Sequence, residues 1–406
     1  MNTATWIEKE NQLLAHNYHP LPVVLTKGAG VWLWDIEGKR YLDMMSAYSA
    51  VSHGHCHPEL VQTLYEQAQK LCVSSRAFHS DQLLSLAEKL CEISGLDAIL
   101  PMNTGAEAVE TAVKAARRWG YQIKGIPADK AEIIVMKDNF HGRTVTITSF
   151  STEAAYREGF GPFTPGFKVV PFGDIEALTQ AITPNTCAIL AEPMQGEAGV
   201  LIPPVGYLKA LREVSKAHQV LLILDEIQTG LGRTGKWFAY QHEGIQPDGI
   251  IIGKALGGGI LPVSAFVATK AVMSVFTPGS HGSTFGGNPL ACRVARQALD
   301  IMERDHYVNN SAKLGDHLLA GLKSIQSEAI RAIRGKGLWV GLEINPKVIS
   351  ARVVCEKLME QGILSKEAHD TVIRFAPPLI IDQTTLDWAL TRIKDTFAML
   401  CAKASY

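Results

Sequence analysis

The sequence predicts an α/β protein with a large domain built on a mostly parallel central sheet, followed by a smaller α/β domain at the C-terminal end. Short apolar runs alternate with longer helical patterns, which is typical of β-α-β units. Polar or glycine-rich turns follow each apolar run. The chain of 406 residues is also longer than one hydrophobic core usually supports. We therefore expect two domains rather than one.

Four apolar runs predict buried strands of the large domain, and they indicate where a ligand should bind. In open α/β sheets, ligands bind beyond the carboxyl ends of the strands. The turns after these strands are therefore where functional residues are expected. The predicted strands are residues 133–136, 188–190, 220–224 and 249–252.

A glycine-rich stretch at residues 286–289 predicts a hinge between the domains. The pattern after it favours a mixture of helices and strands. Helices are expected over 290–304, over 312–325 and from Thr384 onward, with strands near 338–344 and at 372–375.

The first 50 residues look extended, with Trp32, Trp34 and Tyr41 around a turn. We expect this segment to pack with the small domain. The predicted division is then 1–50 for the N-terminal segment, 51–286 for the large cofactor-binding domain and 287–406 for the small domain.

Bulk properties exclude several classes of function. The formal net charge is −1 and no basic run stands out, which argues against nucleic acid as a partner. No apolar run approaches the roughly 18 residues needed to span a bilayer, and Met1–Glu10 lacks a signal or transit pattern. The seven cysteines are scattered without a CxxC pair, which favours a reducing, cytoplasmic location.

Two strand ends carry residues that suggest covalent chemistry. Lys254 follows the run 249–252 and is flanked by glycines. An apolar surrounding lowers a lysine pKa from about 10.4, and the neutral amine can then bond to an aldehyde. Asp225 ends the neighbouring run, where a carboxylate can pair with a pyridinium nitrogen. A lysine with its head in water and a solvated strand end are the plain structural alternatives.

A third segment has the form of a phosphate site. Gly105 and Ala106 stand at the expected start of a helix that runs to about Trp119. Free N–H groups at a helix start bind phosphate. A helix whose glycine-containing start binds nothing is equally compatible with this pattern.

The run from Gly230 to Lys236 resembles two nucleotide-binding patterns but completes neither. It matches the start of GxxxxGK[ST], but Trp237 stands where Ser or Thr should hold magnesium. It also matches GxGxxG, with Asp248 as the acidic residue, but residues 225–229 separate it from the strand. Because the GxGxxG match is partial, a nicotinamide-dependent oxidoreductase remains only as the alternative from a different class.

Three histidines at alternate positions, His53, His55 and His57, could share a strand face and bind zinc. Pro58 instead indicates a loop, and the sequence contains no second group of ligands of similar density. No metal site is expected.

In combination, these motifs resemble the class III aminotransferases of fold type I, over essentially the whole chain. That family uses pyridoxal 5'-phosphate. His141 stands where some relatives have tryptophan, and we expect this change to leave the site unaltered. The segments that carry the resemblance are Gly54–Pro58, Asn103–Glu107, Phe140–Arg143, Glu192–Gly199, Asp225–Gly230, Gly253–Gly257 and Gly282–Pro289.

The resemblance implies roles for residues around the cofactor ring. Lys254 would carry the cofactor and move the proton, and Asp225 would hold the pyridinium nitrogen. Gln228 would contact the ring hydroxyl, and Phe140 would stack on the ring.

The resemblance also implies which residues bind the phosphate group of the cofactor. Gly105 and Ala106 would donate backbone N–H groups to it. Thr284, together with Ser283, would reach it from the partner subunit, which implies a homodimer or a higher homo-oligomer.

Four further segments match the subgroup whose amino donor is ornithine: His16–Pro22, Tyr48–Val51, Gly159–Phe163 and Arg374–Pro378. This implies transfer of the δ-amino group of L-ornithine to 2-oxoglutarate. The products would be glutamate and glutamate 5-semialdehyde, which cyclises to pyrroline-5-carboxylate. Acetylornithine and 4-aminobutyrate are alternative donors within the class, and a catalytically silent binding protein is an alternative outside it.

The substrate pocket would be formed by Tyr18, Tyr48, Arg143, Glu197 and Arg374. Ornithine presents its δ-carbon without a neighbouring carboxylate, whereas glutamate presents its α-carbon with one. We hypothesise that Glu197 neutralises Arg374 when ornithine is bound and releases it for glutamate, while Arg143 holds the far carboxylate. A merely structural Glu197–Arg374 ion pair is the alternative.

Overall fold

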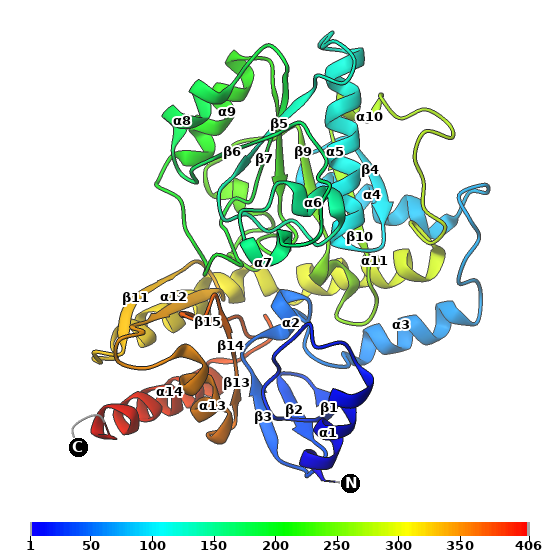
Figure 1. Cartoon of the computed structure of the whole chain (residues 1–406). Helices are drawn as coiled ribbons and strands as arrows, with labels where there is room; N and C mark the ends of the chain where they lie inside the picture. The colour runs from blue at the N-terminus through cyan, green and yellow to red at the C-terminus, as the bar shows by residue number, and fades with distance from the viewer. Residues whose placement is uncertain (1, 404–406) are drawn as a thin grey trace.

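The computed structural model describes residues 2–403 and confirms the predicted α/β architecture (Figure 1). The large domain contains a seven-stranded sheet of order β4-β10-β9-β8-β7-β5-β6. Five neighbouring strands are parallel, and β10 is antiparallel to both β4 and β9. The strands are β4 (Ala98–Met102), β5 (Glu132–Met136), β6 (Phe167–Val170), β7 (Thr186–Ala191), β8 (Leu221–Asp225), β9 (Gly249–Ile252) and β10 (Ser264–Ala268).

All four predicted strands of this domain are present, as β5, β7, β8 and β9. The sequence analysis did not predict β4, β6 or β10. β10 is buried throughout, but Ser264, Ala265 and Ala268 leave it with a single branched apolar side chain, Val267.

Alternate residues of this sheet face two separate cores, as the two-residue period of a strand requires. Ile133 and Val135 pack toward α5 (Gly105–Gln122), which covers one face. Ile134 and Met136 point to the other face and join the core with buried residues of α4 (Asp81–Ser94), α9 (Tyr207–Ala217) and α11 (Pro289–Arg304).

The C-terminal part is a second α/β unit around an antiparallel sheet of order β11-β12-β15-β14. The helices and strands predicted there are confirmed. The predicted hinge leads into α11, which crosses the middle of the molecule and packs on α3 (Pro58–Ala68) and α4 (Figure 1). The elements are β11 (Ile330–Gly335), β12 (Val340–Ile344), β14 (Lys366–Ala368), β15 (Val372–Phe375), α12 (Tyr307–Lys323), α13 (Ala351–Glu360) and α14 (Gln383–Lys403).

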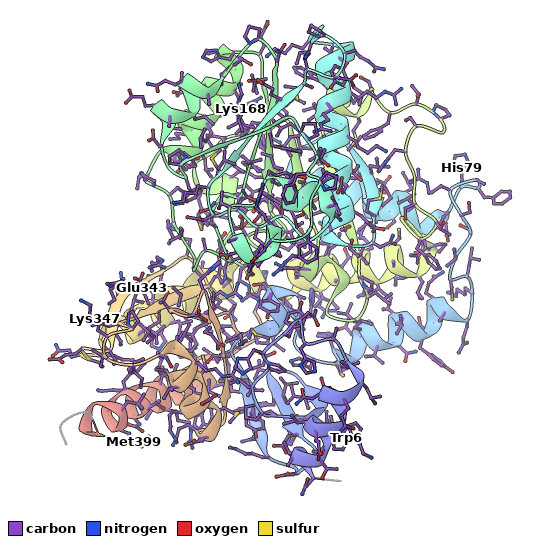
Figure 2. All side chains as sticks on the ribbon, in the orientation of Figure 1. Trp6, His79, Lys168, Glu343, Lys347 and Met399 are labelled. Atoms are coloured by element: carbon purple, nitrogen blue, oxygen red, sulfur yellow. The ribbon has the colours of Figure 1, made fainter. Side chains whose placement is uncertain are left out.

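The N-terminal segment forms β1 (Leu25–Ala29), β2 (Trp32–Asp35) and β3 (Arg40–Asp43), and β3 pairs in parallel with β13 (Ile363–Leu364). The expectation of an entirely extended segment was wrong, because α1 (Thr3–Leu13) is a helix capped by Asn2. α1 contains no buried residue, so no apolar stripe marked it; Trp6 lies at the edge of the molecule in Figure 2.

The remaining elements are short or connect the larger ones. They are α2 (Ser46–Ser49), α3 (Pro58–Ala68), α6 (Val145–Ser149), α7 (Ala154–Arg157), α8 (Ile175–Ala181), α10 (Lys270–Met273) and the 3-10 helices η1 (Ala239–His242) and η2 (Lys254–Gly257). Within residues 2–403, no helix has both the length and the apolar character to cross a membrane.

Candidate active site

The predicted cofactor residues meet around one cavity of about 220 Å³ at the carboxyl ends of the central strands. Asp225 is the last residue of β8, and Lys254 follows β9 after one glycine. The start of α5 closes the cavity on a third side. The lining includes Gly105, Ala106, Phe140, Asp225, Gln228 and Lys254, so residues far apart in sequence converge where the strand topology predicts a ligand.

Lys254 is the first residue of η2 and has a φ of +46°, a left-handed conformation that side-chain-bearing residues seldom adopt. Such backbone strain concentrates at functional sites. Burial lowers the pKa of Lys254 from its usual value, and the nearby Glu197 and Asp225 carboxylates oppose this shift. The site therefore favours a neutral amine more than water does.

Asp225 is buried and held in place by two hydrogen bonds. Its Oδ2 lies 2.7 Å from His141 Nδ1, and its Oδ1 accepts the backbone N–H of Ile227 at 3.0 Å. His141 is also buried, which lowers its pKa, but the bond to Asp225 overcomes this and the net pKa is raised. His141 thus fixes the position of the Asp225 carboxylate.

Glu192 is a second buried carboxylate near this pair. Its Oε1 accepts the N–H of Phe140 at 2.9 Å, and its Oε2 accepts the N–H of Gly196 at 3.2 Å. Burial raises the pKa of Glu192 to about 7, with His141 opposing and Asp225 adding to the rise. Glu192 therefore fixes the backbone on which Phe140 sits.

The start of α5 provides a built anion site. Thr104 and Glu107 form a capping box, in which Thr104 Oγ1 accepts the N–H of Glu107 and Glu107 Oε2 accepts the N–H groups of Asn103 and Thr104. The N–H groups of Gly105 and Ala106 fall in the first turn, where no intrahelical acceptor exists. Both residues line the cavity, so the donors are available to a phosphate group.

Phe140 and Gln228 both line the cavity. Phe140 packs edge-on against Tyr156, with ring centroids 6.0 Å apart. Gln228 is buried beside Gly196, where a Cβ would lie only 1.8 Å from Gln228 Oε1. Glycine at 196 is therefore required for Gln228 to occupy this position. An aromatic ring with a ring nitrogen, a hydroxyl and a phosphate fits the groups that surround the cavity.

Ser283 and Thr284 lie beside the same helix start, in the segment before α11. Ser283 Oγ accepts the Nδ2–H of Asn103 at 2.9 Å and the N–H of Gly286 at 3.0 Å. Thr284 is exposed, and the neighbouring Phe285 is 56% exposed. The single chain thus places both residues near the α5 start, with Thr284 and Phe285 facing outward.

Glu197 and Arg374, two of the predicted substrate residues, form a close ion pair, with Arg374 Nη1 2.6 Å from Glu197 Oε1. Burial opposes the charge on Glu197, but Arg374 more than compensates and holds the pKa of Glu197 below its usual value. The Arg374 guanidinium also lies 5.0 Å from the ring centroid of Tyr48. The pair is near enough to Lys254 for both members to influence its pKa.

Arg143 and Tyr18 are more open to solvent than this pair. Arg143 is exposed and lies over the ring of Tyr156, 3.5 Å from its centroid; it forms no ion pair within the described part of the chain. A cavity of about 230 Å³ lies between Phe140, Tyr156 and Glu197. Tyr18 is 75% exposed and lines a separate cavity together with Tyr48.

The alternative motifs have structural explanations. Gly232 and Gly235 have φ near +85°, and the turn that contains them packs against α12 rather than opening onto a ligand cavity. Asp248 pairs with Arg212 at 2.6 Å. His53 Nε2 bonds to the carbonyl of Ala298, and His55 bonds to Asp43. Across residues 2–400, whose side chains the structure describes, no group of three or more potential ligands could hold a metal.

The sequence analysis missed His141 and Glu192. It treated His141 as a replacement without effect on the site, although a histidine next to Phe140 could have been considered as a partner for Asp225. Glu192 directly follows β7, and Asp225 is the last residue of β8, so their similar positions at the carboxyl ends of neighbouring strands were an available signal.

Known proteins give a consistent comparison. The family model described as Aminotransferase class-III matches residues 13–397. An ornithine aminotransferase from Brevibacillus brevis is 58% identical over 388 residues, which is 96% of each chain. One from Bacillus subtilis is 54% identical over 388 residues, again 96% of each.

Two solved structures extend this comparison. The ornithine aminotransferase of Toxoplasma gondii, described with partial occupancy of PLP at its active site, has a TM-score of 0.98 at 41% identity and covers 100% of this chain and 96% of that one. An acetylornithine aminotransferase from Elizabethkingia anophelis has a TM-score of 0.90 at 45% identity, with 98% and 100% covered.

Proposed function

The chain belongs to the class III aminotransferases, which use pyridoxal 5'-phosphate, and on that premise we propose that it is an ornithine δ-aminotransferase. It would transfer the δ-amino group of L-ornithine to 2-oxoglutarate. The products would be glutamate and glutamate 5-semialdehyde, which cyclises to pyrroline-5-carboxylate.

The observation that carries this proposal is the Glu197–Arg374 pair beside Lys254. An unpaired arginine at this position would attract a carboxylate next to the reacting carbon and so favour α-amino acids. The paired arginine is neutralised, which suits the δ-carbon of ornithine. Curated relatives that are 54% to 58% identical over nearly the whole chain are ornithine aminotransferases, which supports the same donor.

The chain's own residues would divide the work around the cofactor. Pyridoxal phosphate, when bound, accepts the amino nitrogen at its aldehyde and draws negative charge from the substrate carbon into its ring. Lys254 would hold the cofactor, and its amine would move the proton at the reacting carbon. Asp225, fixed by His141, would pair with the ring nitrogen and keep it charged.

The two substrates would use the same pocket in different ways. With ornithine, Glu197 stays paired with Arg374, and Arg143 holds the far carboxylate with Tyr18 near the distal amine. With glutamate, Glu197 releases Arg374, which then binds the α-carboxylate while Arg143 binds the distal one. Arginine–carboxylate pairing with two parallel hydrogen bonds suits both ends.

We also propose that the enzyme is a cytoplasmic homodimer. Several apolar side chains of α3, of the following loop and of the start of α4 are exposed, and Phe285 adds to them. A patch of this kind marks a protein interface. Its second copy would bring Thr284 to the phosphate cradle of the partner. The exposed residues are Val61, Tyr65, Leu71, Val73, Phe78 and Leu84.

The donor assay tests the proposed reaction. The purified holoenzyme is given 2-oxoglutarate with ornithine, acetylornithine or 4-aminobutyrate in turn, and pyrroline-5-carboxylate and glutamate are measured. Ornithine should be the preferred donor by kcat/KM. A preference for acetylornithine would instead place this chain with the relative from Elizabethkingia anophelis, and a preference for 4-aminobutyrate would also reject the proposal.

A further inference from the structure

Arg233 is a completely buried arginine with no established task. It lies in the glycine-rich turn after β8, and its side chain is 0% exposed. Within residues 2–403 it forms no ion pair; its guanidinium is surrounded by backbone carbonyls and a hydroxyl instead. A buried charge without a bonded counter-ion is expensive, and three hydrogen bonds from Nη1 and Nη2 offset this cost, while Nε has no partner among the described residues.

Two of these hydrogen bonds hold the sheet that carries Arg374, and the hydrogen bonds of the Arg233 guanidinium are together called the clasp below. Arg233 Nη1 donates to the carbonyl of Leu338 at 2.9 Å and to the carbonyl of Pro377 at 2.6 Å. Leu338 lies just before β12, and Pro377 just after β15. Since these strands are antiparallel with Val340 opposite Phe375, both carbonyls lie at the same end of the strand pair. That end is the one next to Arg374.

The third bond reaches the segment that carries Tyr48. Arg233 Nη2 donates to Ser52 Oγ at 3.2 Å, and Ser52 Oγ donates to the carbonyl of Ser49 at 3.2 Å. Ser49 ends α2, in which each of the four residues from 46 to 49 has a positive φ. Such a left-handed turn of non-glycine residues is strained and persists only when its surroundings hold it.

The backbone of Arg233 is itself fixed against the small domain. Ser311 Oγ on α12 donates to the carbonyl of Arg233 at 2.9 Å. Gly337 approaches so closely that a Cβ there would lie 2.5 Å from the same carbonyl oxygen. Arg233 therefore connects three parts of the chain: the turn after β8, the strand pair β12 and β15, and the segment that carries Tyr48.

We propose that Arg233 is a positioning residue for donor selectivity: it holds Arg374 and Tyr48 in register with the large domain that carries Lys254. This inference rests on the proposed ornithine reaction and assigns the part of the chain that sets its regiochemistry. If the clasp loosens, β15 shifts, the Glu197–Arg374 pair opens, and Arg374 becomes available to an α-carboxylate. Displacement of a binding group by about 1 Å can cost about 100-fold in rate.

The test compares Arg233→Met with Arg212→Met in the holoenzyme. Arg212 is a half-buried arginine of α9 whose ion pair with Asp248 lies outside the site, so its variant controls for general loss of stability. Active sites are counted by cofactor absorbance, and ornithine turnover at the δ-amine and at the α-amine is measured per active site. Arg233→Met should lower the δ-to-α ratio by about tenfold and raise the KM for ornithine more than it lowers kcat. Arg212→Met should leave the ratio unchanged.

Ser52→Ala keeps the inference testable if Arg233→Met does not fold. It removes one acceptor of Arg233 and frees the Ser49 carbonyl, so it should shift the ratio in the same direction by a smaller factor. An unchanged δ-to-α ratio in folded Arg233→Met, or in Ser52→Ala where the first variant does not fold, overturns the positioning role.

A second readout is independent of the donor. Hydrogen exchange in residues 338–344 and 372–379 should accelerate in Arg233→Met and not in Arg212→Met. If wild-type enzyme prefers another donor, the proposed function fails, and the exchange data still decide whether Arg233 holds these strands: unaltered exchange there overturns the clasp.

Discussion

At the scale of single residues, burial sets the charge of the groups around the central cavity as much as residue type does. Burial lowers the pKa of Lys254 and raises that of Glu192 to about 7. His141 departs from this trend because its bond to Asp225 outweighs burial. The site thus combines an amine that burial makes easier to deprotonate with a histidine whose charged form is favoured by its bond to Asp225.

Lys254→Ala should abolish most turnover while the fold remains. No other group in the cavity is proposed to move the proton, and a general base contributes roughly 100- to 10,000-fold to a rate. We expect kcat to fall by at least about 100-fold, with the variant still binding the cofactor. In the wild type, borohydride reduction followed by mass spectrometry should place the cofactor on Lys254. Lys168→Ala, on the edge strand β6 and labelled in Figure 2, is the control, and an adduct on a different lysine would refute the assignment.

Glu197→Ala should change which amine of ornithine reacts. Without the carboxylate, Arg374 loses its 2.6 Å partner and can bind the α-carboxylate beside the reacting carbon. Ornithine δ-transfer should weaken relative to glutamate α-transfer, and reaction at the α-amine of ornithine should rise. The two half-reactions are followed separately by cofactor absorbance. Equal losses in both would indicate that the ion pair is only structural.

His141→Phe should destabilise the protein more at low pH than at high pH. The folded-state pKa of His141 lies above its usual value, so its charged bond to Asp225 contributes fully below about pH 6.5 and is lost as pH rises through the raised pKa. The difference in thermal midpoint between wild type and variant should therefore be larger at about pH 6 than at about pH 9. A difference that is constant across this range, or that grows with pH, contradicts the assigned charge.

At the scale of elements, we expect the capping of α5 to influence cofactor binding, because the proposed phosphate donors lie in its first turn. Glu107→Ala removes the acceptor for the N–H groups of Asn103 and Thr104, and a lost cap costs about 1 kcal/mol. Because Gly105 and Ala106 belong to the same turn, cofactor affinity should fall together with the thermal midpoint. Cofactor titration of the apoenzyme measures the first and thermal unfolding the second.

The matched control is Asp174→Ala, which removes the cap of α8 away from the cavity. It should lose a comparable amount of stability with unchanged cofactor affinity. Equal effects of both variants on cofactor affinity would show that the capping box of α5 has no specific role in binding the phosphate group.

Elements with strong periodic patterns were predictable from the sequence, and elements defined by their partners were not. Four strands, β5, β7, β8 and β9, are rich in branched apolar residues, so their own sequence is enough to predict them as strands. β10 became a strand through pairing with β4 and β9, and α1 became a helix without any buried face. The strand-end rule likewise located Lys254 and Asp225.

The sequence did not reveal contacts between distant segments. The bond from His141 to Asp225 joins residues 84 positions apart, and the bond from Arg233 to Pro377 joins residues 144 apart. Neither spacing has a local pattern, because the fold alone brings the partners together. Sequence motifs therefore do not reveal side chains whose function is to hold another residue in place.

At the scale of the whole molecule, the apolar surface of α3, the following loop and the start of α4 lies on one side, away from the small domain (Figure 1). His79 marks this loop at the edge of the molecule in Figure 2. A hollow of about 570 Å³ lies beside Phe78, Leu83 and Leu84. Large apolar side chains around a hollow are the features of a surface that another protein fills, and the proposed dimer fills it with a second copy.

Phe78→Asp should convert the dimer to monomers and weaken cofactor binding at the same time. Phe78 is 72% exposed in the single chain, so a charge there costs little in the fold but would be buried in the proposed interface. Light scattering should report half the wild-type mass, and cofactor affinity should fall because Thr284 of the second copy no longer reaches the cradle. Val205→Asp, at a fully exposed apolar residue before α9, should change neither. A Phe78→Asp protein that remains dimeric would remove this surface from the interface. Monomers with wild-type cofactor affinity would show that each chain completes its own phosphate site.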